Sequence, residues 1–161
     1  MSPVQNDRTI SFTIFQKATG KATVHHTRSG IAYHTKEQRF NADAPMTEML
    51  PFRPPEPITD PVYLIINVTF TVPGAKPKWW REAALAGYIE YDKKPDFDNI
   101  LKQCVDCLKK LQFFKDDAQV CCGECSKEYG EKNVIEITII PQHNFSRAEW
   151  NKMKEKSECL N

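Results

Sequence analysis

Alternating polar and apolar residues predict a small β-sheet. Residues 9–14 read Thr-Ile-Ser-Phe-Thr-Ile, and residues 133–140 alternate around three isoleucines; this period of two is typical of strands with one buried face. Residues 62–72 are apolar almost throughout and rich in β-branched and aromatic side chains, which indicates a strand at the centre of the sheet. Shorter strands are expected at residues 22–26, 31–33 and 119–122.

Spacings of three and four residues predict helices. The segment 98–111 carries apolar residues at this spacing, which are expected to form its buried stripe: Leu101, Cys104, Val105 and Leu108. Asp96 or Asp98 can cap the first turn of this helix. Ser146 and Glu149 have the spacing of a capping box, so a last helix is predicted to begin at Ser146.

Prolines and chain length indicate how the chain is organised. Six prolines fall within residues 41–61, a density that predicts a long ordered loop or a lid. We expect a flexible tail at residues 1–8 and one domain over residues 9–161, because 161 residues is the length of a single domain. The predicted strands and helices make this a mixed α/β (α+β) domain, with a small mixed sheet packed against helices.

The chain has no segment typical of a membrane or secreted protein. No apolar run approaches the ~20 residues needed to cross a bilayer, and the first residues contain no apolar leader. We therefore expect a cytoplasmic protein that does not insert into a membrane. Its 22 basic and 21 acidic residues give a net charge of +1, a balance that identifies no partner by itself because local patches decide association.

One basic and aromatic segment is a candidate nucleic-acid surface. Lysine and arginine neutralise backbone phosphates, and a tryptophan can stack on an unpaired base. Trp79 and Trp80 lie in this segment, where burial in the core or in a subunit interface is the equal alternative. The candidate DNA-binding residues are Lys76, Lys78, Arg81, Lys93 and Lys94.

Acidic residues gather around the start of the predicted helix. Asp96 and Asp98 lie two residues apart, and Lys102 follows one helical turn after Asp98. If the chain returns after the helix, Asp116 and Asp117 meet them. Two or three carboxylates with phosphate oxygens complete a Mg²⁺ site. Ordinary capping, an ion pair within the helix and a solvated turn are the alternative, and spacing alone favours that commoner outcome.

Three segments resemble a known motif. Residues 94–102 read Lys-Pro-Asp-Phe-Asp-Asn-Ile-Leu-Lys, residues 106–108 read Asp-Cys-Leu, and residues 114–120 read Phe-Lys-Asp-Asp-Ala-Gln-Val. They resemble the RusA family of Holliday junction resolvases, whose pattern is Pro-Asp-x-Asp-Asn-Leu-x-Lys, Asp-x-Leu and Asp-Asp-x-Gln-Val at closely similar spacing. The resemblance implies a homodimeric, metal-dependent endonuclease of DNA recombination and repair that hydrolyses phosphodiester bonds in four-way junctions. Phage and prophage occurrence of the family suggests a mobile-element origin.

The resemblance also implies roles for individual residues. Catalytic and metal-binding roles fall on Asp96, Asp98 and Asp117, and a catalytic role falls on Lys102, the motif lysine. Asp116 matches the neighbouring acidic position and is a further metal-ligand candidate. The expected ion is Mg²⁺, with Mn²⁺ as an alternative. A nuclease of the same fold that acts on flaps or replication forks would carry the same motif.

The cysteines raise a different hypothesis, a non-catalytic DNA-binding module stabilised by zinc. Cys104-x-x-Cys107 and Cys122-x-x-Cys125 have nearly the spacing of a zinc ribbon. The first pair, however, falls on the predicted helix, with Cys104 on its apolar stripe, whereas zinc ribbons place such pairs on turns. Because cysteine packs well as a small apolar residue, we expect buried thiols and no structural zinc.

Overall fold

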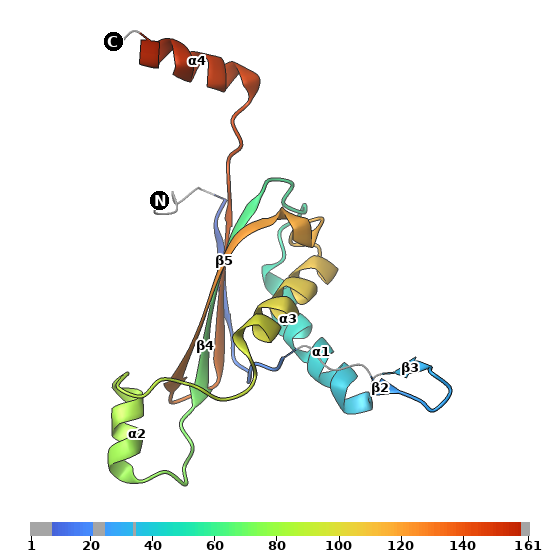
Figure 1. Cartoon of the computed structure of the whole chain (residues 1–161), viewed down its shortest axis with the longest axis vertical. Coiled ribbons are helices and arrows are strands. Elements are labelled where there is room, and N and C mark those ends of the chain that lie inside the picture. Colours follow the sequence, from blue (N-terminus) through green and yellow to red (C-terminus); the bar gives the residue numbers. More distant parts are fainter. Residues whose placement is uncertain (1–7, 21–24, 34, 159–161) are drawn as a thin grey trace.

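The structure is a computed structural model, and it describes residues 8–20, 25–33 and 35–158. Its strands are β1 (Ile10–Ile14), β2 (His25–His26), β3 (Ala32–Tyr33), β4 (Val62–Thr71), β5 (Val120–Gly130) and β6 (Val134–Pro141). Its helices are α1 (Lys36–Met49), α2 (Lys78–Leu85), α3 (Phe97–Lys110) and α4 (Arg147–Glu158), with two 3-10 turns, η1 (Leu50–Phe52) and η2 (Asp117–Gln119). This is a mixed α+β fold, as the sequence predicts (Figure 1).

One mixed sheet forms the centre of the molecule. Its strand order is β1-β6-β4-β5, and β2 pairs with β3 in a separate two-stranded sheet. β4 lies in the interior, antiparallel to β6 and parallel to β5, so the predicted central position of this strand is confirmed. The predicted strands at residues 9–14 and 133–140 are also confirmed, as β1 and β6, which pair antiparallel.

The two faces of the sheet differ in chemistry. On β4, alternate side chains are fully or almost fully buried on the face toward α1 and α3 (Figure 1): Val62, Leu64, Ile66, Val68 and Phe70. Burying each such side chain contributes about 1.5–3 kcal/mol. The opposite face carries hydrogen-bonded polar pairs, such as Ser126 with Asn67 at 2.8 Å and Ser11 with Thr138 at 3.0 Å. The alternation of apolar and polar residues therefore places the hydrophobic core on the face of the sheet that the helices cover.

The connection between the parallel strands β4 and β5 contains α2 and then α3. Such a crossover carries the chain back along the sheet, so the two ends of α3 lie at opposite ends of the sheet. The predicted helix at 98–111 is confirmed, but its buried side is rotated. Cys104 and Leu108 are buried as expected, whereas Ile100 and Cys107 replace Leu101 and Val105, which are only partly buried because the helix packs against α1 as well as the sheet.

The proline-rich loop predicted at residues 41–61 is wrong in its first half, because α1 continues to Met49. Pro45 lies inside α1, where it lacks the N–H of a normal helix hydrogen bond. Pro45 and Met49 are both buried, so packing against the core offsets this loss. The other five prolines follow α1, in η1 and the irregular segment before β4, and there the prediction holds.

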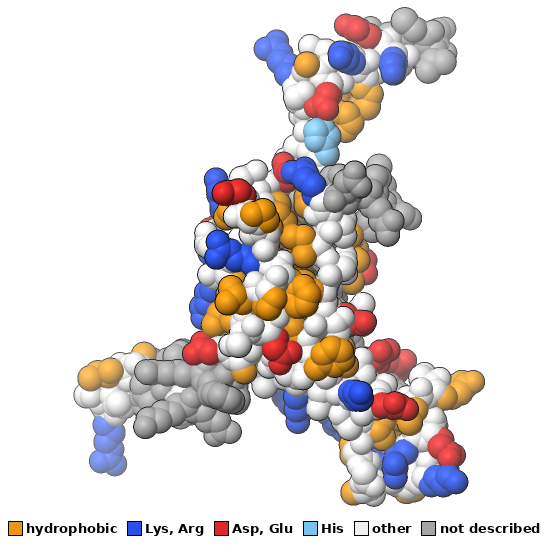
Figure 2. Space-filling view, turned by 180° about the vertical axis from the view of Figure 1, so that it is seen from behind, with side chains coloured by type: hydrophobic (Ala, Val, Ile, Leu, Met, Phe, Trp, Pro, Cys, Tyr) orange, Lys and Arg blue, Asp and Glu red, His pale blue; other side chains and the backbone are white. Residues whose placement is uncertain are grey.

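β5 is much longer than the strand predicted at 119–122. Its side chains are mostly small or polar, and the strand forms because it pairs along the whole of β4. At the other end of the chain, Glu149 accepts a hydrogen bond from the Ser146 N–H (2.8 Å), and Ser146 Oγ accepts one from the Glu149 N–H (3.3 Å). The predicted capping box of α4 is confirmed. Hydrophobic side chains on α4, including Trp150 and Met153, remain exposed (Figure 2).

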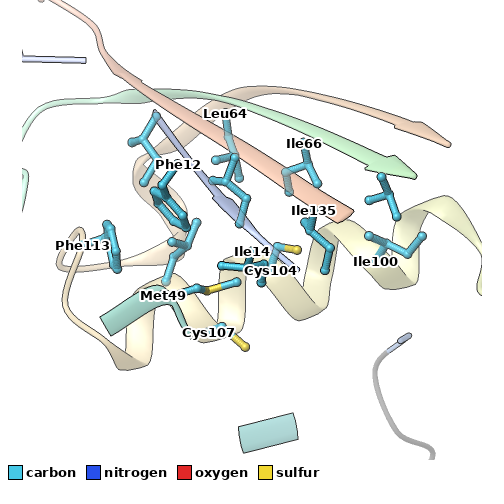
Figure 3. Packing of buried hydrophobic residues seen from close by; sticks show 14 of the residues in the cluster. Phe12, Ile14, Met49, Leu64, Ile66, Ile100, Cys104, Cys107, Phe113 and Ile135 are labelled. Carbon is cyan, nitrogen blue, oxygen red and sulfur yellow. The ribbon is translucent and has the colours of Figure 1, made fainter. Parts of the chain in front are cut away.

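The cysteines do not form the arrangement of a zinc ribbon. Cys104 and Cys107 are buried within the core (Figure 3), and burial raises the pKa of Cys104 strongly and that of Cys107 to about 11. Cys122 and Cys125 lie three residues apart on β5, so their side chains point to opposite faces of the sheet. No helix in the described part of the chain is long and apolar enough to span a membrane.

Candidate active site

The first turn of α3 presents two solvent-facing carboxylates. Asp96 occupies the N-cap position, but the predicted side-chain cap is wrong, because the Asp96 carboxylate accepts no capping hydrogen bond and pairs with Lys94. Asp98 lies in the first turn, 3.7 Å from the Nζ of Lys102. The side chains of Asp96 and Asp98 are 48% and 53% exposed. Because the helix N-terminus favours negative charge, both carboxylates are stable there while remaining open to a ligand.

The segment before α3 is held by β5. Lys127 donates hydrogen bonds to the carbonyl oxygens of Lys93 (3.0 Å) and Pro95 (3.1 Å). Tyr91 donates from its hydroxyl to the Lys94 carbonyl at 2.8 Å, and its ring stacks on Phe70 with centroids 4.0 Å apart. These contacts fix the backbone that leads into Asp96. Lys127 was missed by the sequence analysis, since no local motif marks a lysine whose contacts lie more than thirty residues away.

A close approach of the chain supports the other side of this turn. A Cβ placed on Gly20 would lie 3.2 Å from the Cβ atoms of both Pro95 and Asn99. A larger residue at Gly20 would have to displace them. The glycine therefore allows the segment after β1 to pack against the start of α3, beside Asp96 and Asp98.

The second acidic pair lies beyond the last turn of α3 and is engaged in local structure. Asp116 caps η2: it accepts from the Ala118 N–H at 2.9 Å, while Gln119 Oε1 accepts from the Asp116 N–H at 2.9 Å. Lys109 Nζ lies 2.8 Å from Asp117 Oδ1 and 3.3 Å from Asp116 Oδ2. The hydrogen bond from Lys109 lowers the pKa of Asp117, and the same bond raises the pKa of Lys109.

The structure places the predicted acidic residues in two groups. Asp96 and Asp98 lie at the start of α3, and Asp116 and Asp117 contact Lys109 in its last turn. From residue 98 to residue 109 the helix rises about 16 Å. Among the described residues, no three His, Cys, Asp or Glu side chains are placed to hold one metal ion. Asp96 and Asp98 are two carboxylates of the type that bind magnesium together with waters, and Asp117 lies with Lys109 at the other end of α3.

Lys109 was not singled out by the sequence analysis, although a signal for it exists. It follows Asp98 by eleven residues, and eleven residues are close to three full helical turns. Asp98, Lys102 and Lys109 therefore share one face of α3.

The candidate DNA-binding residues lie on two elements. Lys78 and Arg81 belong to α2, which projects from one end of the sheet (Figure 1), and Lys76 precedes it with its Nζ 4.9 Å from the Trp80 ring centroid. Lys93 pairs with Asp92 at 2.9 Å, in the segment before α3 that also holds Lys94.

The two tryptophans have different surroundings. Trp80 packs edge-on against Tyr129, with ring centroids 5.3 Å apart, so it helps attach α2 to β5. Trp79 is 67% exposed. Its indole is therefore available to a ligand or a partner, whereas that of Trp80 has a structural contact.

Comparison with known proteins identifies the family. Residues 15–140 match the family model described as Endodeoxyribonuclease RusA. The chain is 30% identical over 125 residues to the crossover junction endodeoxyribonuclease rusA of Lactococcus phage r1t, an alignment that covers 77% of this chain and 82% of that protein. It is 36% identical over 89 residues to the uncharacterized protein YqaN of Bacillus subtilis strain 168, covering 54% and 62% of the two chains. The chain, whose matched residues include both ends of α3, therefore belongs to the RusA family of endodeoxyribonucleases.

Proposed function

We propose that this protein hydrolyses phosphodiester bonds in four-way DNA junctions during recombination and repair. The observation that carries the proposal is the exposed pair Asp96 and Asp98 at the start of α3, with Lys102 one turn further along. This group lies inside the segment that matches the RusA family. The phage relative, of which the alignment covers 82%, is named for crossover junctions.

Asp96 and Asp98 are the residues that would hold a divalent ion. Mg²⁺ is commonly bound by one or two carboxylates together with waters and substrate phosphates, and Mn²⁺ accepts the same oxygen ligands. When bound, such an ion polarises the phosphoryl group and makes water a better nucleophile. Lys102 adds a fixed positive charge beside the carboxylates, where it can stabilise the charge that develops on the scissile phosphate.

The basic residues on and before α2 supply a binding surface. Lys76, Lys78 and Arg81 would contact phosphates by charge neutralisation, and the exposed Trp79 can stack on a base near the branch point. A four-way junction has two-fold symmetry, so a homodimer with two equivalent sites matches it. We propose that the dimer acts in the cytoplasm, on DNA held there.

The experiment is a cleavage assay on matched DNA substrates. The purified protein is incubated with an end-labelled four-way junction, a flap, a fork and a linear duplex, with Mg²⁺, with Mn²⁺ and with EDTA. We expect paired cuts in opposed strands of the junction with either ion, no cutting of the duplex, and loss of cleavage in EDTA without change in the circular dichroism spectrum.

Two results would contradict the proposal. Faster cutting of flaps or forks than of junctions would mean that the protein is a nuclease whose preferred substrate is not the four-way junction. Tight junction binding without cleavage under any ion would make the protein a binding module.

A further inference from the structure

A small pocket lies beside the segment that leads into α3. Its volume is about 210 Å³, and it lies where β4 and β5 end, at the end of the sheet from which α2 projects (Figure 1). Pockets that enclose a drug-sized ligand measure about 300–1,000 Å³, so this one suits a smaller chemical group. The residues that line it include Lys17, Phe70, Tyr91, Lys93, Tyr129 and Asn133.

Three aromatic rings of this pocket contact one another. The Tyr91 ring stacks on Phe70 with centroids 4.0 Å apart, and it lies 4.9 Å from the Tyr129 ring. Phe70 and Tyr129 are only 2% and 9% exposed, and Trp80 packs against Tyr129 from α2. The rings are therefore held in place before any ligand arrives, and they offer an apolar surface against which a nucleobase can pack.

Polar and cationic groups surround these rings. Lys17 and Lys93 line the pocket and are both exposed, so they can attract a phosphate. The Asn133 Oδ1 accepts a hydrogen bond from the Thr71 N–H at 3.1 Å, which fixes an amide that can hydrogen-bond the edge of a base. An apolar ligand needs no cations and a bare anion needs no aromatic rings. Together these groups fit a nucleotide, with its base inside and its phosphate at the rim.

The pocket and the candidate active site share a segment of backbone. The Tyr91 hydroxyl donates to the Lys94 carbonyl at 2.8 Å. Lys127, whose Nζ is 5.3 Å from the Tyr91 ring centroid, donates to two other carbonyls of the same segment. Lys93 precedes Asp96 by three residues, so their Cα atoms lie within about 11 Å of each other. Because one strand of B-DNA advances about 3.4 Å per nucleotide, that separation corresponds to a few nucleotides.

We propose that this pocket binds one unpaired nucleotide of the DNA strand that is cut, a few positions from the scissile phosphate. The inference rests on the proposed function for its DNA substrate, but its binding chemistry can be tested without cleavage. Extruding a base from a duplex costs a few kcal/mol and costs least where the base is already unpaired. The pocket would thus favour branched DNA over a continuous duplex.

The first test measures binding of the nucleotide itself. Isotope-labelled protein in EDTA is titrated separately with a 5′-phosphorylated thymidine dinucleotide, with thymidine and with inorganic phosphate, and the amide signals are followed by NMR. We expect the dinucleotide to shift the amides of Tyr91, Lys93, Tyr129 and Asn133 at lower concentration than either fragment. No shift at these amides at millimolar dinucleotide overturns the proposal. Equal shifts with phosphate alone would overturn it too, because the pocket would then bind only an anion.

Variants of the pocket separate its rings from its charges. Tyr91→Leu should weaken dinucleotide binding at least about fivefold, because a packed ring is lost, whereas Tyr91→Phe keeps the ring and should bind nearly as the wild type does. Lys17→Gln should weaken binding about two- to fivefold. Because Lys93 is already paired with Asp92 at 2.9 Å, Lys17 is the better position at which to remove a charge.

The matched control for the charge is Lys132→Gln. Lys132 is exposed in the turn between β5 and β6, next to Asn133 in the sequence, and its loss should leave dinucleotide binding unchanged. If Tyr91→Leu fails to fold, the comparison of Lys17→Gln with Lys132→Gln still decides. Equal affinities in these two variants overturn the proposal.

The second test asks whether a base of a DNA junction enters the pocket. A four-way junction carrying 5-iodouracil a few nucleotides from the branch point is bound to the protein in EDTA and irradiated, and the cross-linked peptide is identified by mass spectrometry. We expect cross-links at Tyr91 or Tyr129, and none there from a continuous duplex with the same sequence. Cross-links confined to other aromatic residues such as Trp79, or equal cross-linking from the duplex, would overturn the proposal.

The outcomes also separate the pocket from the nuclease assignment. A protein that cleaves junctions but gives neither the amide shifts nor the cross-links keeps the proposed function and loses the pocket. A protein that gives both signals and cleaves no DNA keeps the pocket and loses the proposed function.

Discussion

Acidic residues and lysines lie at both ends of α3, but the carboxylates at the two ends make different contacts. At the start, Asp96 occupies the N-cap position without making the capping hydrogen bond, and both it and Asp98 stay exposed beside lysines. At the end, Asp116 accepts a capping hydrogen bond and Asp117 is held by Lys109. Asp116 thus makes both a backbone cap and an ion pair, whereas the described contacts of Asp96 and Asp98 are ion pairs with lysines on an exposed surface.

This contrast in contacts leads to different expectations for changes at the two ends of α3. A side-chain cap commonly contributes about 1 kcal/mol; Asp96 lacks this hydrogen bond and pairs with Lys94 instead. At the other end, the Asp116 side chain caps η2, the turn that begins with Asp117. Changes at the start should therefore affect the reaction first, and changes at Asp116 should affect the fold first.

Asp98→Asn should have the largest effect. The amide keeps the shape but loses the charge that attracts a cation, so the junction cleavage rate should fall by at least about a hundredfold, with junction binding and thermal stability unchanged. The matched control is Asp92→Asn, which removes an exposed carboxylate that pairs with the neighbouring Lys93 and should leave cleavage near wild type. Equal losses of cleavage rate in the two variants would show that Asp98 has no special role in the reaction.

Lys102→Ala should come next. We expect the cleavage rate to fall about tenfold or more while junction binding weakens only slightly, because one fixed charge near the phosphate is lost and several other cations share the binding. Lys110→Ala, an exposed lysine on the same helix, is the control and should affect neither. Binding and rate that fall in equal proportion for Lys102→Ala would speak against a catalytic role.

Asp116 should separate stability from activity. Asp116→Ala should lower the free energy of unfolding by about 1 kcal/mol, because the cap of η2 is lost, whereas Asp116→Asn should retain most of it. Urea denaturation measures both. In cleavage, Asp116→Asn should be milder than Asp117→Asn; the reverse order would mean that Asp116 is the functional member of the pair.

The smallest effect concerns pH. Lys109 lowers the pKa of Asp117 in the folded protein, so the ion pair adds stability above the ordinary carboxyl pKa and loses it as pH falls through the lowered value. Lys109→Gln should return the pKa of Asp117 toward its ordinary value, as followed by carboxyl NMR titration. An unchanged titration would show that Lys109 is not the cause.

Much of the fold was predictable because its signals are local. The period-two segments and the helix at 98–111 carry their own apolar patterns, and Ser146 with Glu149 carries its own cap. α1 and the length of β5 were not predictable. Pro45 argues against a helix, and β5 has few residues typical of strands; packing on the core and pairing with β4 decide these cases.

In the candidate site, too, local features were predictable from the sequence and long-range contacts were not. The motif places Asp96, Asp98 and Lys102 near one another because they lie within two turns of chain. The position of Asp117 depends on where the crossover through α3 ends, and the support given by Lys127 depends on tertiary contacts. Neither follows from spacing in the sequence.

The most direct measurement asks whether a divalent ion binds at the start of α3. Mn²⁺ broadens the NMR signals of amides close to it, so it is titrated into isotope-labelled protein and into the Asp98→Asn variant. We predict that the amides around Asp96–Leu101 broaden first and that the variant loses this effect. Broadening centred on the exposed glutamates of the open sheet face, Glu124, Glu128 and Glu136, and unchanged in the variant, would contradict the account.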